Sequence, residues 1–381
     1  MLEIKNYIYN PKNTLGKGSF STVFLGENII NRQKVAIKKI NIKNFKKFEP
    51  HIMSEINILK NINHLNIINL IDNIVEKDTI YIILEYCSLG DLNEFYKNVM
   101  VKEIYVKHYA KQLLDSLRYL HNYNITHRDI KPHNILLSDI YTVKLTDFGF
   151  AKENKIDLSS TLCGSPIYMA PEIMQCKEYN SKTDIWSYGV VLYQLLYGTV
   201  PYIANNQFEL MCVIRDTLPD YNSKYISNDC ILLLQLLLNK NPQDRPDINK
   251  LSENEWFNNN YEFKKLNSSS TYQLYNEMII NNDSSTKDKT LSSSSSLNVS
   301  NEDNIFQFDE EIDQENNNNT NTNNFYNTID LSNSNNTNDV KEYVFIENNY
   351  KCEKLDKTST LMYSLSNVYD KFVNNYFYKE S

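Results

Sequence analysis

The sequence predicts an α+β chain with two lobes, a small β-rich lobe followed by a larger, mostly helical lobe. Strand-like runs with apolar residues at every second position fill the chain up to about residue 86. Helical periodicity takes over from about Leu92, as in VKHYAKQLLDSLRYLHNY and TDIWSYGVVLYQLLYG. After Phe257 the composition changes to Asn, Ser and Thr, which marks the end of the folded part.

The first lobe is expected to be a small sheet with one main helix. A glycine-containing turn, LGKGSFSTV at 15–23, joins two strands, and KVAIKKI at 34–40 forms a third. The stretch HIMSEINILKNI then has a helical pattern, and IINLIDNI and TIYIILEY indicate two further strands.

The acidity of the chain lies in its C-terminal part. Residues 258–381 carry 10 Lys and no Arg against 19 Asp and Glu, whereas residues 1–257 carry 29 basic and 28 acidic side chains. Neither part has the strongly basic balance that is typical of nucleic-acid-binding proteins, so we expect no nucleic-acid partner.

Glycine, proline and tryptophan divide the chain at the same place, because all of them fall before residue 258. We therefore predict one folded domain at 7–257, with the β-rich lobe at about 7–86 and the helical lobe at about 87–257. An Asn- and Ser-rich acidic linker at 258–340 is expected to be largely disordered, since it cannot bury enough apolar surface to offset its conformational entropy. A C-terminal segment at 341–381 follows.

The six cysteines are scattered, with no Cys-x-x-Cys pair and no His at metal-ligand spacing, which indicates reduced thiols inside the cell. The N-terminus, MLEIKNYIYN, lacks the pattern of a secretory signal. The apolar run CILLLQLLL is about half as long as a membrane-spanning helix. We therefore expect a cytoplasmic protein without a membrane span.

Two motifs in the first lobe suit phosphate binding but are weak when taken singly. In the loop from Gly16 to Ser21, missing side chains allow backbone N–H groups to approach phosphate oxygens, although a tight hairpin without a ligand explains the loop equally well. Lys38 lies in the strand VAIK, and Glu55 follows in the helix. A lysine held by a carboxylate stays charged and can grip nucleotide phosphates. A solvent-exposed Lys and an unrelated Glu are the simpler alternative.

The octet HRDIKPHN at 127–134 favours phosphate binding over the simpler alternatives, because DFG follows the octet at the end of another short strand. Asp129 could accept a proton from an attacking hydroxyl, and Lys131 could neutralise charge on a phosphoryl group. Asn134 and Asp147 offer hard oxygen ligands that suit Mg²⁺. This combination predicts the catalytic loop of a phosphoryl-transfer site.

Together these motifs resemble the protein kinase family, over about residues 7–257. The glycine-rich loop, VAIK, the helix Glu, HRDIKPHN, DFG and APE occur in the order that the family shows. The resemblance implies a bilobal fold, ATP under the loop, and Mg²⁺ with Mn²⁺ as an alternative cation. The residues expected at ATP are Leu15, Gly16, Lys17, Gly18, Ser19, Phe20, Ser21, Val23, Ala36, Lys38, Glu55, Glu85, Cys87, Asp91 and Leu136.

The same resemblance assigns roles around the nucleotide and in the second lobe. It implies hinge contacts from Glu85 and Cys87 after a gatekeeper at Leu84, an adenine floor at Leu136 and a ribose contact at Asp91. The expected catalytic residues are Asp129, Lys131 and Asn134, and the expected metal ligands are Asn134 and Asp147. Asp184 is expected to brace the catalytic loop, and Arg245 to pair with Glu172.

Substrate class and regulation also follow from the resemblance. Lysine two residues after Asp129, together with GSPIY, is similar to the serine/threonine type and unlike the tyrosine type, so protein Ser/Thr hydroxyls are the expected acceptors. Thr161 stands at the position that matches the family's activating phosphorylation site, where Arg128 would hold the phosphate. Three ordinary loop hydroxyls at Ser159, Ser160 and Thr161 are the alternative.

Phrases such as GKGSFSTVF, LEYCSLGDL and TLCGSPIYMAPEIM resemble the autophagy-initiating serine/threonine kinases, which implies a role in autophagy or stress signalling. In the tail, Tyr343 to Ile346 has the form of segments that add a strand to ubiquitin-like autophagy modifiers, although chance is an alternative and residues 326–329 fit the same pattern. Residues 355–378 are expected to form one amphipathic helix.

Two other function classes remain open from the sequence. A pseudokinase scaffold would bind partners through the same fold and tail, but such a protein usually lacks at least one of the catalytic residues, all of which are present here. A small-molecule kinase is disfavoured by the full TLCGSPIYMAPE segment, which resembles a ledge for a protein substrate.

Overall fold

The structure is a computed structural model, and the chain divides into two compact units, Met1–Val299 and Ser300–Ser381. The described residues are 1–18, 21–43, 49–153, 165–177, 179–258, 263, 265 and 270–280, with the backbone of 342–346, 351–356 and 359–363. Of the predicted site residues, Ser19, Phe20 and Thr161 lie outside these ranges, as does the alternative tail motif at 326–329.

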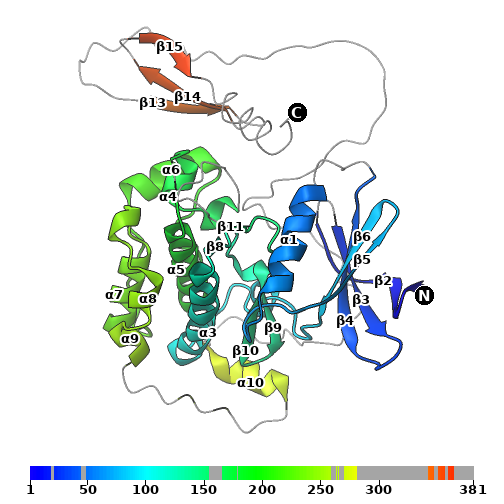
Figure 1. Ribbon diagram of the computed structural model, residues 1–381. Coiled ribbons are helices and arrows are strands. Elements are labelled where there is room, and N and C mark those ends of the chain that lie inside the picture. The colour runs from blue at the N-terminus through cyan, green and yellow to red at the C-terminus, as the bar shows by residue number, and fades with distance from the viewer. Residues whose placement is uncertain are drawn as a thin grey trace. The chain divides into compact units, whose positions relative to one another are not determined.

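The first lobe is a six-stranded antiparallel sheet with one helix beside it (Figure 1). Its elements are β1 (Leu2–Ile4), β2 (Tyr7–Lys17), β3 (Ser21–Asn28), β4 (Lys34–Asn41), α1 (Glu49–Asn61), β5 (Leu70–Glu76) and β6 (Thr79–Glu85), and the strands lie in the order β1-β2-β3-β4-β6-β5. The sheet begins ahead of the predicted boundary at residue 7, because Ile4 is buried and pairs with Tyr7. The small β-rich lobe with one main helix is confirmed.

The second lobe is mostly helical, and two long helices form its centre. Its elements up to residue 258 are α2 (Leu92–Phe95), β7 (Met100–Val101), α3 (Glu103–Asn122), β8 (Ile125–Thr126), η2 (Pro132–Asn134), β9 (Ile135–Asp139), β10 (Thr142–Leu145), β11 (Lys152–Glu153), η3 (Pro166–Tyr168), α4 (Pro171–Met174), α5 (Lys182–Tyr197), α6 (Gln207–Asp216), α7 (Asn228–Leu237), η4 (Pro242–Asp244), α8 (Ile248–Leu251) and α9 (Glu255–Asn258). Helix α5 is buried along most of its length, because it packs against α3 and α7 (Figure 1). The bilobal α+β fold is confirmed.

Two backbone bridges hold the short hairpin β9–β10, one to the first lobe and one to the start of the second lobe. Ile67, in the loop after α1, forms a parallel bridge with Leu145 at the end of β10. Asp91, just after the first lobe, forms an antiparallel bridge with Leu136 on β9. Because both bridges are between backbones, they set where the loop after β10 begins relative to the first lobe.

A buried ion pair joins two segments of the second lobe that lie far apart in the sequence. Arg245 Nη1 donates to Glu172 Oε1 at 2.6 Å and Arg245 Nη2 donates to Glu172 Oε2 at 2.8 Å. The two side chains are only 0% and 4% exposed, and the guanidinium lies over the Trp186 ring. Two parallel hydrogen bonds hold this pair in one geometry, so it ties the start of α4 to the loop before α8.

Part of the predicted linker, residues 270–280, is folded onto the second lobe. They form α10 (Thr271–Met278) and β12 (Ile279–Ile280), and β12 pairs with β7. The reason is apolar burial, because Leu274, Met278 and Ile279 are each at most 9% exposed within an otherwise polar stretch.

The second unit contains a three-stranded antiparallel sheet, β13 (Glu342–Ile346), β14 (Lys351–Asp356) and β15 (Ser359–Tyr363). The helix predicted at 355–378 is therefore wrong for the described residues 355–356 and 359–363, and its other residues lie outside the described ranges. Strand pairing replaces helical periodicity here, since β14 forms hydrogen bonds with strands on both sides.

In the part of the chain that the structure describes, no helix has the length and apolar character needed to cross a bilayer.

We predict that Arg245→Met lowers the free energy of unfolding by about 3–5 kcal/mol, because the Glu172 carboxylate then stays buried without its counter-charge. Chemical denaturation followed by circular dichroism measures the change. The matched control is Arg215→Met, since the pair of Arg215 with Asp216 is more than half exposed and solvent screens it, so its loss should change the free energy of unfolding far less. Equal losses of unfolding free energy in the two variants would contradict a stabilising role for the buried pair of Arg245 with Glu172.

Candidate active site

Three predicted site residues from three different elements meet at one ammonium group. Lys38 on β4 lies 2.8 Å from Glu55 Oε1 on α1 and 3.2 Å from Asp147 Oδ1, measured from Nζ. Glu55 is nearly buried, and the Lys38 side chain is 16% exposed. The ammonium group therefore connects the sheet, its helix and the loop after β10.

The electrostatics of this cluster keep Lys38 charged. Burial alone would lower the pKa of Lys38, but the carboxylates of Asp147 and Glu55 outweigh that effect and hold the pKa above its ordinary value. The nearby Lys38 charge in turn lowers the pKa of Asp147. Asp147 has a φ of 63°, a left-handed backbone conformation that is uncommon for a residue with a side chain. Such a conformation costs free energy and persists only where the surroundings impose it.

The predicted catalytic residues form a second cluster. Asn134 Nδ2 donates to the Asp129 carbonyl oxygen and to Asp129 Oδ2, each at 2.8 Å. Lys131 Nζ lies 2.9 Å from Asp129 Oδ2 and donates to Ser165 Oγ at 2.7 Å. The Ser165 backbone N–H donates to Asp129 Oδ1 at 3.2 Å. Asp129 is 4% exposed, so its carboxylate is oriented by fixed donors and not by bulk water.

Asp184 braces the loop that carries Asp129. Its fully buried carboxylate accepts from the backbone N–H groups of His127 at 3.0 Å and of Arg128 at 2.9 Å. A third contact joins Asp184 Oδ2 to His121 Nε2 at 2.8 Å. Burial opposes ionisation, but the hydrogen bonds and the nearby histidines lower the pKa of Asp184. Arg128 has a φ of 70°, and this carboxylate holds the strained turn in place.

The two clusters are connected through the backbone. The N–H of Thr146 donates to the carbonyl oxygen of Asn134 at 2.9 Å, and His127 Nε2 lies 3.1 Å from the carbonyl oxygen of Thr146. Thr146 directly precedes Asp147, so the loop with Asp129 and the loop with Asp147 share these contacts.

The residues predicted at the nucleotide lie around the junction of the lobes. Leu15, Gly16 and Lys17 end β2, Ser21 and Val23 begin β3, and the N–H of Gly18 donates to the carbonyl oxygen of Ser21 at 2.9 Å. Ala36 on β4 is paired with Leu84 on β6, next to Glu85 at the end of that strand. Cys87 is buried, and Asp91 is paired with Leu136.

Burial raises the pKa of Cys87 to about 12, so this thiol is a structural residue and not a reactive one.

The chemistry of two of these residues fits a divalent cation. Both side-chain hydrogen bonds of Asn134 use its amide nitrogen, which leaves its oxygen as the atom able to coordinate an ion. The Asp147 side chain is 42% exposed and ionised. One carboxylate and one amide oxygen suffice for Mg²⁺ when substrate phosphates and water complete the shell. Among the described residues, no group of three or more His, Cys, Asp and Glu side chains forms a dedicated metal site.

The sequence reasoning missed two residues that hold this region. Lys144 on β10 is 9% exposed, lies 2.9 Å from Glu85 Oε1 and donates to the carbonyl oxygen of Leu65 at 2.7 Å. It therefore links the strand before Asp147 to the end of β6. His121, the second residue, contacts Asp184. A charged residue within the apolar strand TVKL was the available signal for Lys144, and the sequence carries no comparable signal for His121.

Comparison with known proteins agrees with this geometry. The family described as "Protein kinase domain" matches residues 9–257. Serine/threonine-protein kinases ATG1c and ATG1b of Arabidopsis thaliana are 43% identical over 253 residues and 44% identical over 240 residues. These matches cover 64% and 61% of this chain and 34% of each relative, so the chain spans about a third of their length.

The putative serine/threonine-protein kinase R517/R518 of Acanthamoeba polyphaga mimivirus is 38% identical over 290 residues, which cover 67% of this chain and 64% of that protein. The family match contains both clusters of the site, the brace at Asp184 and the buried pair of Glu172 with Arg245. With more than half of its length inside that match, the chain belongs to the protein kinase family.

Proposed function

We propose that the protein is a serine/threonine kinase that transfers the γ-phosphate of ATP to Ser and Thr hydroxyls of protein substrates. Membership of the protein kinase family implies the use of ATP and a divalent cation. The observation that carries the proposal is the pair of clusters joined through Thr146, one with a lysine between two carboxylates and one with an aspartate oriented by a lysine and an amide.

The first cluster is the proposed phosphate grip. Lys38 is charged, nearly buried and fixed by Glu55, so it can bind the α- and β-phosphates without first losing a large conformational freedom. The glycine-rich loop from Gly16 to Ser21 offers backbone N–H groups to the other phosphate oxygens. The base and ribose are assigned to the junction of the lobes, with Glu85 and Cys87 at the adenine edge and Asp91 at the ribose.

The second cluster is the proposed catalytic group. The substrate hydroxyl oxygen forms a bond to the γ-phosphorus while the bond from that phosphorus to the bridging oxygen breaks, which releases ADP. The hydroxyl proton passes to the Asp129 carboxylate. Lys131 stabilises the negative charge on the phosphoryl oxygens. Most of the rate enhancement comes from positioning and charge stabilisation, because phosphoryl transfer requires little covalent chemistry from the protein.

Asn134 and Asp147 are the proposed ligands of Mg²⁺, with Mn²⁺ as an alternative, and the ion would neutralise phosphate charge and orient the γ-phosphate. Asp147 is already ionised beside Lys38, as a cation ligand must be.

Three contacts support Ser/Thr specificity. Lys131 reaches both Asp129 and Ser165, and the Ser165 hydroxyl donates to Asp129 Oδ1 at 3.3 Å. These contacts hold Asp129, the proposed acceptor of the hydroxyl proton, next to Ser165. Ser165 belongs to the segment that is proposed to bind the substrate peptide. A pathway in autophagy or stress signalling is supported by the named ATG1 relatives and by the sequence phrases shared with autophagy kinases.

The proposed tail partner is a ubiquitin-like autophagy modifier, bound through Tyr343 to Ile346. These residues lie in β13, an edge strand of the three-stranded sheet, and β14 is its neighbour in the described part of that sheet. A strand with one open edge is the conformation that strand addition requires. The cytoplasmic location stays a prediction from the sequence.

We predict that purified protein with Mg-ATP phosphorylates a degenerate Ser/Thr peptide array and that Asp147→Asn lowers kcat by at least about 10²-fold, because the cation loses its carboxylate ligand. Asp115→Asn is the control, since this half-exposed carboxylate on α3 pairs only with the neighbouring Arg118 in the described structure. Labelling of Tyr-only peptides would contradict the specificity. Absence of any phosphoryl transfer by the unaltered protein would favour the scaffold alternative.

A second prediction concerns Thr161, which lies outside the described residues. Arg128 donates from Nε to the carbonyl oxygen of Phe150 and from Nη1 to the Tyr179 hydroxyl. Its guanidinium group therefore contacts residues that come before and after Thr161 in the sequence. Phosphate on Thr161 should pair with Arg128 and order that segment. Thr161→Ala should lower kcat about tenfold or more and speed proteolysis between residues 150 and 165. Ser159→Ala is the control, and an unchanged Thr161→Ala variant would exclude this switch.

A third prediction concerns the tail. Full-length protein should bind an immobilised ubiquitin-like modifier of the autophagy type, and Tyr343→Ala with Ile346→Ala should weaken binding by at least about tenfold, because both side-chain anchors are lost. Val344→Ala is the matched control, since Val344 lies in the same strand but is not one of the two anchor positions of the motif. Surface plasmon resonance gives the affinities. Unchanged binding by the double variant would remove the tail motif from the account.

A further inference from the structure

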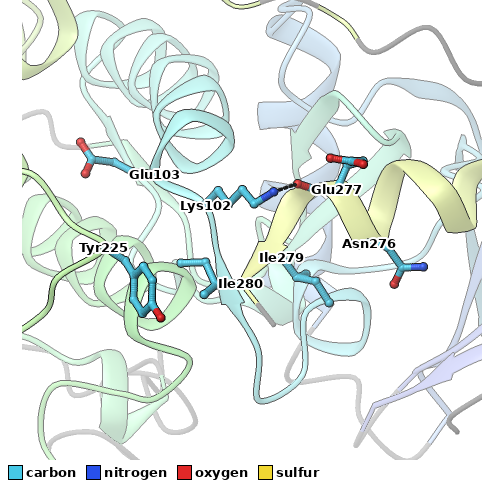
Figure 2. A pocket seen from close by; sticks show the side chains of 7 residues that line it. All are labelled: Lys102, Glu103, Tyr225, Asn276, Glu277, Ile279 and Ile280. Carbon is cyan, nitrogen blue, oxygen red and sulfur yellow. Dashed lines mark hydrogen bonds between the residues drawn. The ribbon is translucent and has the colours of Figure 1, made fainter. Parts of the chain in front are cut away.

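Residues 270–280 lie beyond the family match at 9–257 and nevertheless form part of the folded unit. Helix α10 and strand β12 pack on the second lobe at α2 and β7. Figure 2 shows where this segment meets the start of α3, around a cavity of about 600 Å³. The segment therefore extends the folded unit beyond the residues that the family model matches.

Aromatic and sulfur contacts hold α2 against this segment. The Tyr275 ring stacks on Tyr96, with ring centroids 5.8 Å apart, and meets Phe95 edge-on at 5.4 Å. Met278 is fully buried, and its Sδ accepts from the Tyr96 hydroxyl at 3.6 Å. Tyr96 also contacts the hydroxyl of Tyr109 on α3 at 2.9 Å. Helix α2 is thus enclosed between α3 and α10.

Backbone contacts fix the end of the segment. Ile279 and Ile280 pair with Val101 and Met100 in the short ladder β12–β7. The N–H of Lys102 donates to the carbonyl oxygen of Met278 at 2.8 Å. The Lys102 side chain points across the cavity edge in Figure 2 and donates to the carbonyl oxygen of Glu277 at 2.6 Å. These bonds determine the register in which Tyr275 and Met278 face α2.

Helix α2 depends on such support because it contains only four residues, Leu92–Phe95. An isolated helix of this length is unstable in water, so packing must hold it. Its N-cap is Asp91, whose carboxylate accepts from the Glu94 N–H at 3.0 Å and whose backbone is paired with Leu136. The position of α2 therefore determines the position of the carboxylate assigned to the ribose.

We propose that Tyr275 and Met278 are positioning residues for nucleotide binding, which act through Phe95 and Tyr96 to hold α2 and its N-cap Asp91. This inference rests on the proposed nucleotide site. With the segment docked, Asp91 is fixed at the junction of the lobes before ATP arrives. Without it, the binding of ATP must also order α2, which weakens affinity and leaves the chemical step at Asp129 unchanged.

The test is steady-state kinetics on full-length Tyr275→Ala/Met278→Ala. The KM for ATP should rise about three- to tenfold, because an aromatic contact and a buried side chain are lost. The kcat at saturating ATP should stay within about twofold, as expected when only ground-state binding is weakened. Tyr272→Ala is the matched control, since Tyr272 lies on the same helix and is 52% exposed.

Conservative variants separate positioning from a general loss of structure. Tyr275→Phe keeps the stacked ring and Met278→Leu keeps the buried volume, so both should restore the KM for ATP to within about twofold of the unaltered protein. If the double variant is isolated unfolded, Tyr275→Ala alone carries the same test, because Met278 and Ile279 then keep their burial.

An unchanged KM for ATP in the double variant would overturn the inference, as would an equal rise in Tyr272→Ala. A fall in kcat at constant KM would also overturn it, since that result indicates a smaller active fraction. In each of these cases the unaltered protein is active, so the proposed kinase function would stand. Inactivity of the unaltered protein would instead count against the proposed function itself.

Discussion

The Lys38 ammonium group is the contact on which the rest of the site depends. It draws together a strand, a helix and the loop after β10, because Glu55 and Asp147 each lie within hydrogen-bonding distance of it. Two carboxylates this close to each other would repel, and the positive charge between them makes the arrangement stable. The lysine therefore sets the spacing between α1 and Asp147, where phosphates and a cation are proposed to bind.

Charged side chains of the site maintain backbone conformations that the chain would not adopt alone. Arg128 and Asp147 both have left-handed φ values, and both lie beside a charge that holds them. Asp184 fixes the turn at Arg128 by accepting from backbone N–H groups. Because Asp129 is the next residue, this contact also holds the backbone of Asp129 in place. Strain of this kind is typical of functional sites, where the surrounding structure over-determines an unfavourable geometry. The site is thus rigid at its base.

Much of the fold and of the site could be predicted because the relevant signals are local. Alternating strands, helical periodicity and the motifs around Lys38 and Asp129 are written in short stretches of sequence, and the family resemblance supplied their arrangement. The docking of 270–280 was not predicted, because the polar composition of 258–340 as a whole outweighed the apolar residues of TYQLYNEMII. Its partners Tyr96 and Val101 also lie far away in the sequence. Long-range pairing also explains why residues 355–356 form a strand, despite a helical pattern in the isolated segment.

We propose that Lys38, Asn134 and Asp147 surround one triphosphate and its cation, with Asp129 facing the γ-phosphate. A crystal structure with Mg²⁺ and a non-hydrolysable ATP analogue tests it most directly. We expect Lys38 Nζ to contact the α- or β-phosphate, and oxygens of Asn134 and Asp147 to lie about 2.0–2.1 Å from the metal. A nucleotide bound elsewhere, or a cation without either ligand, would contradict it.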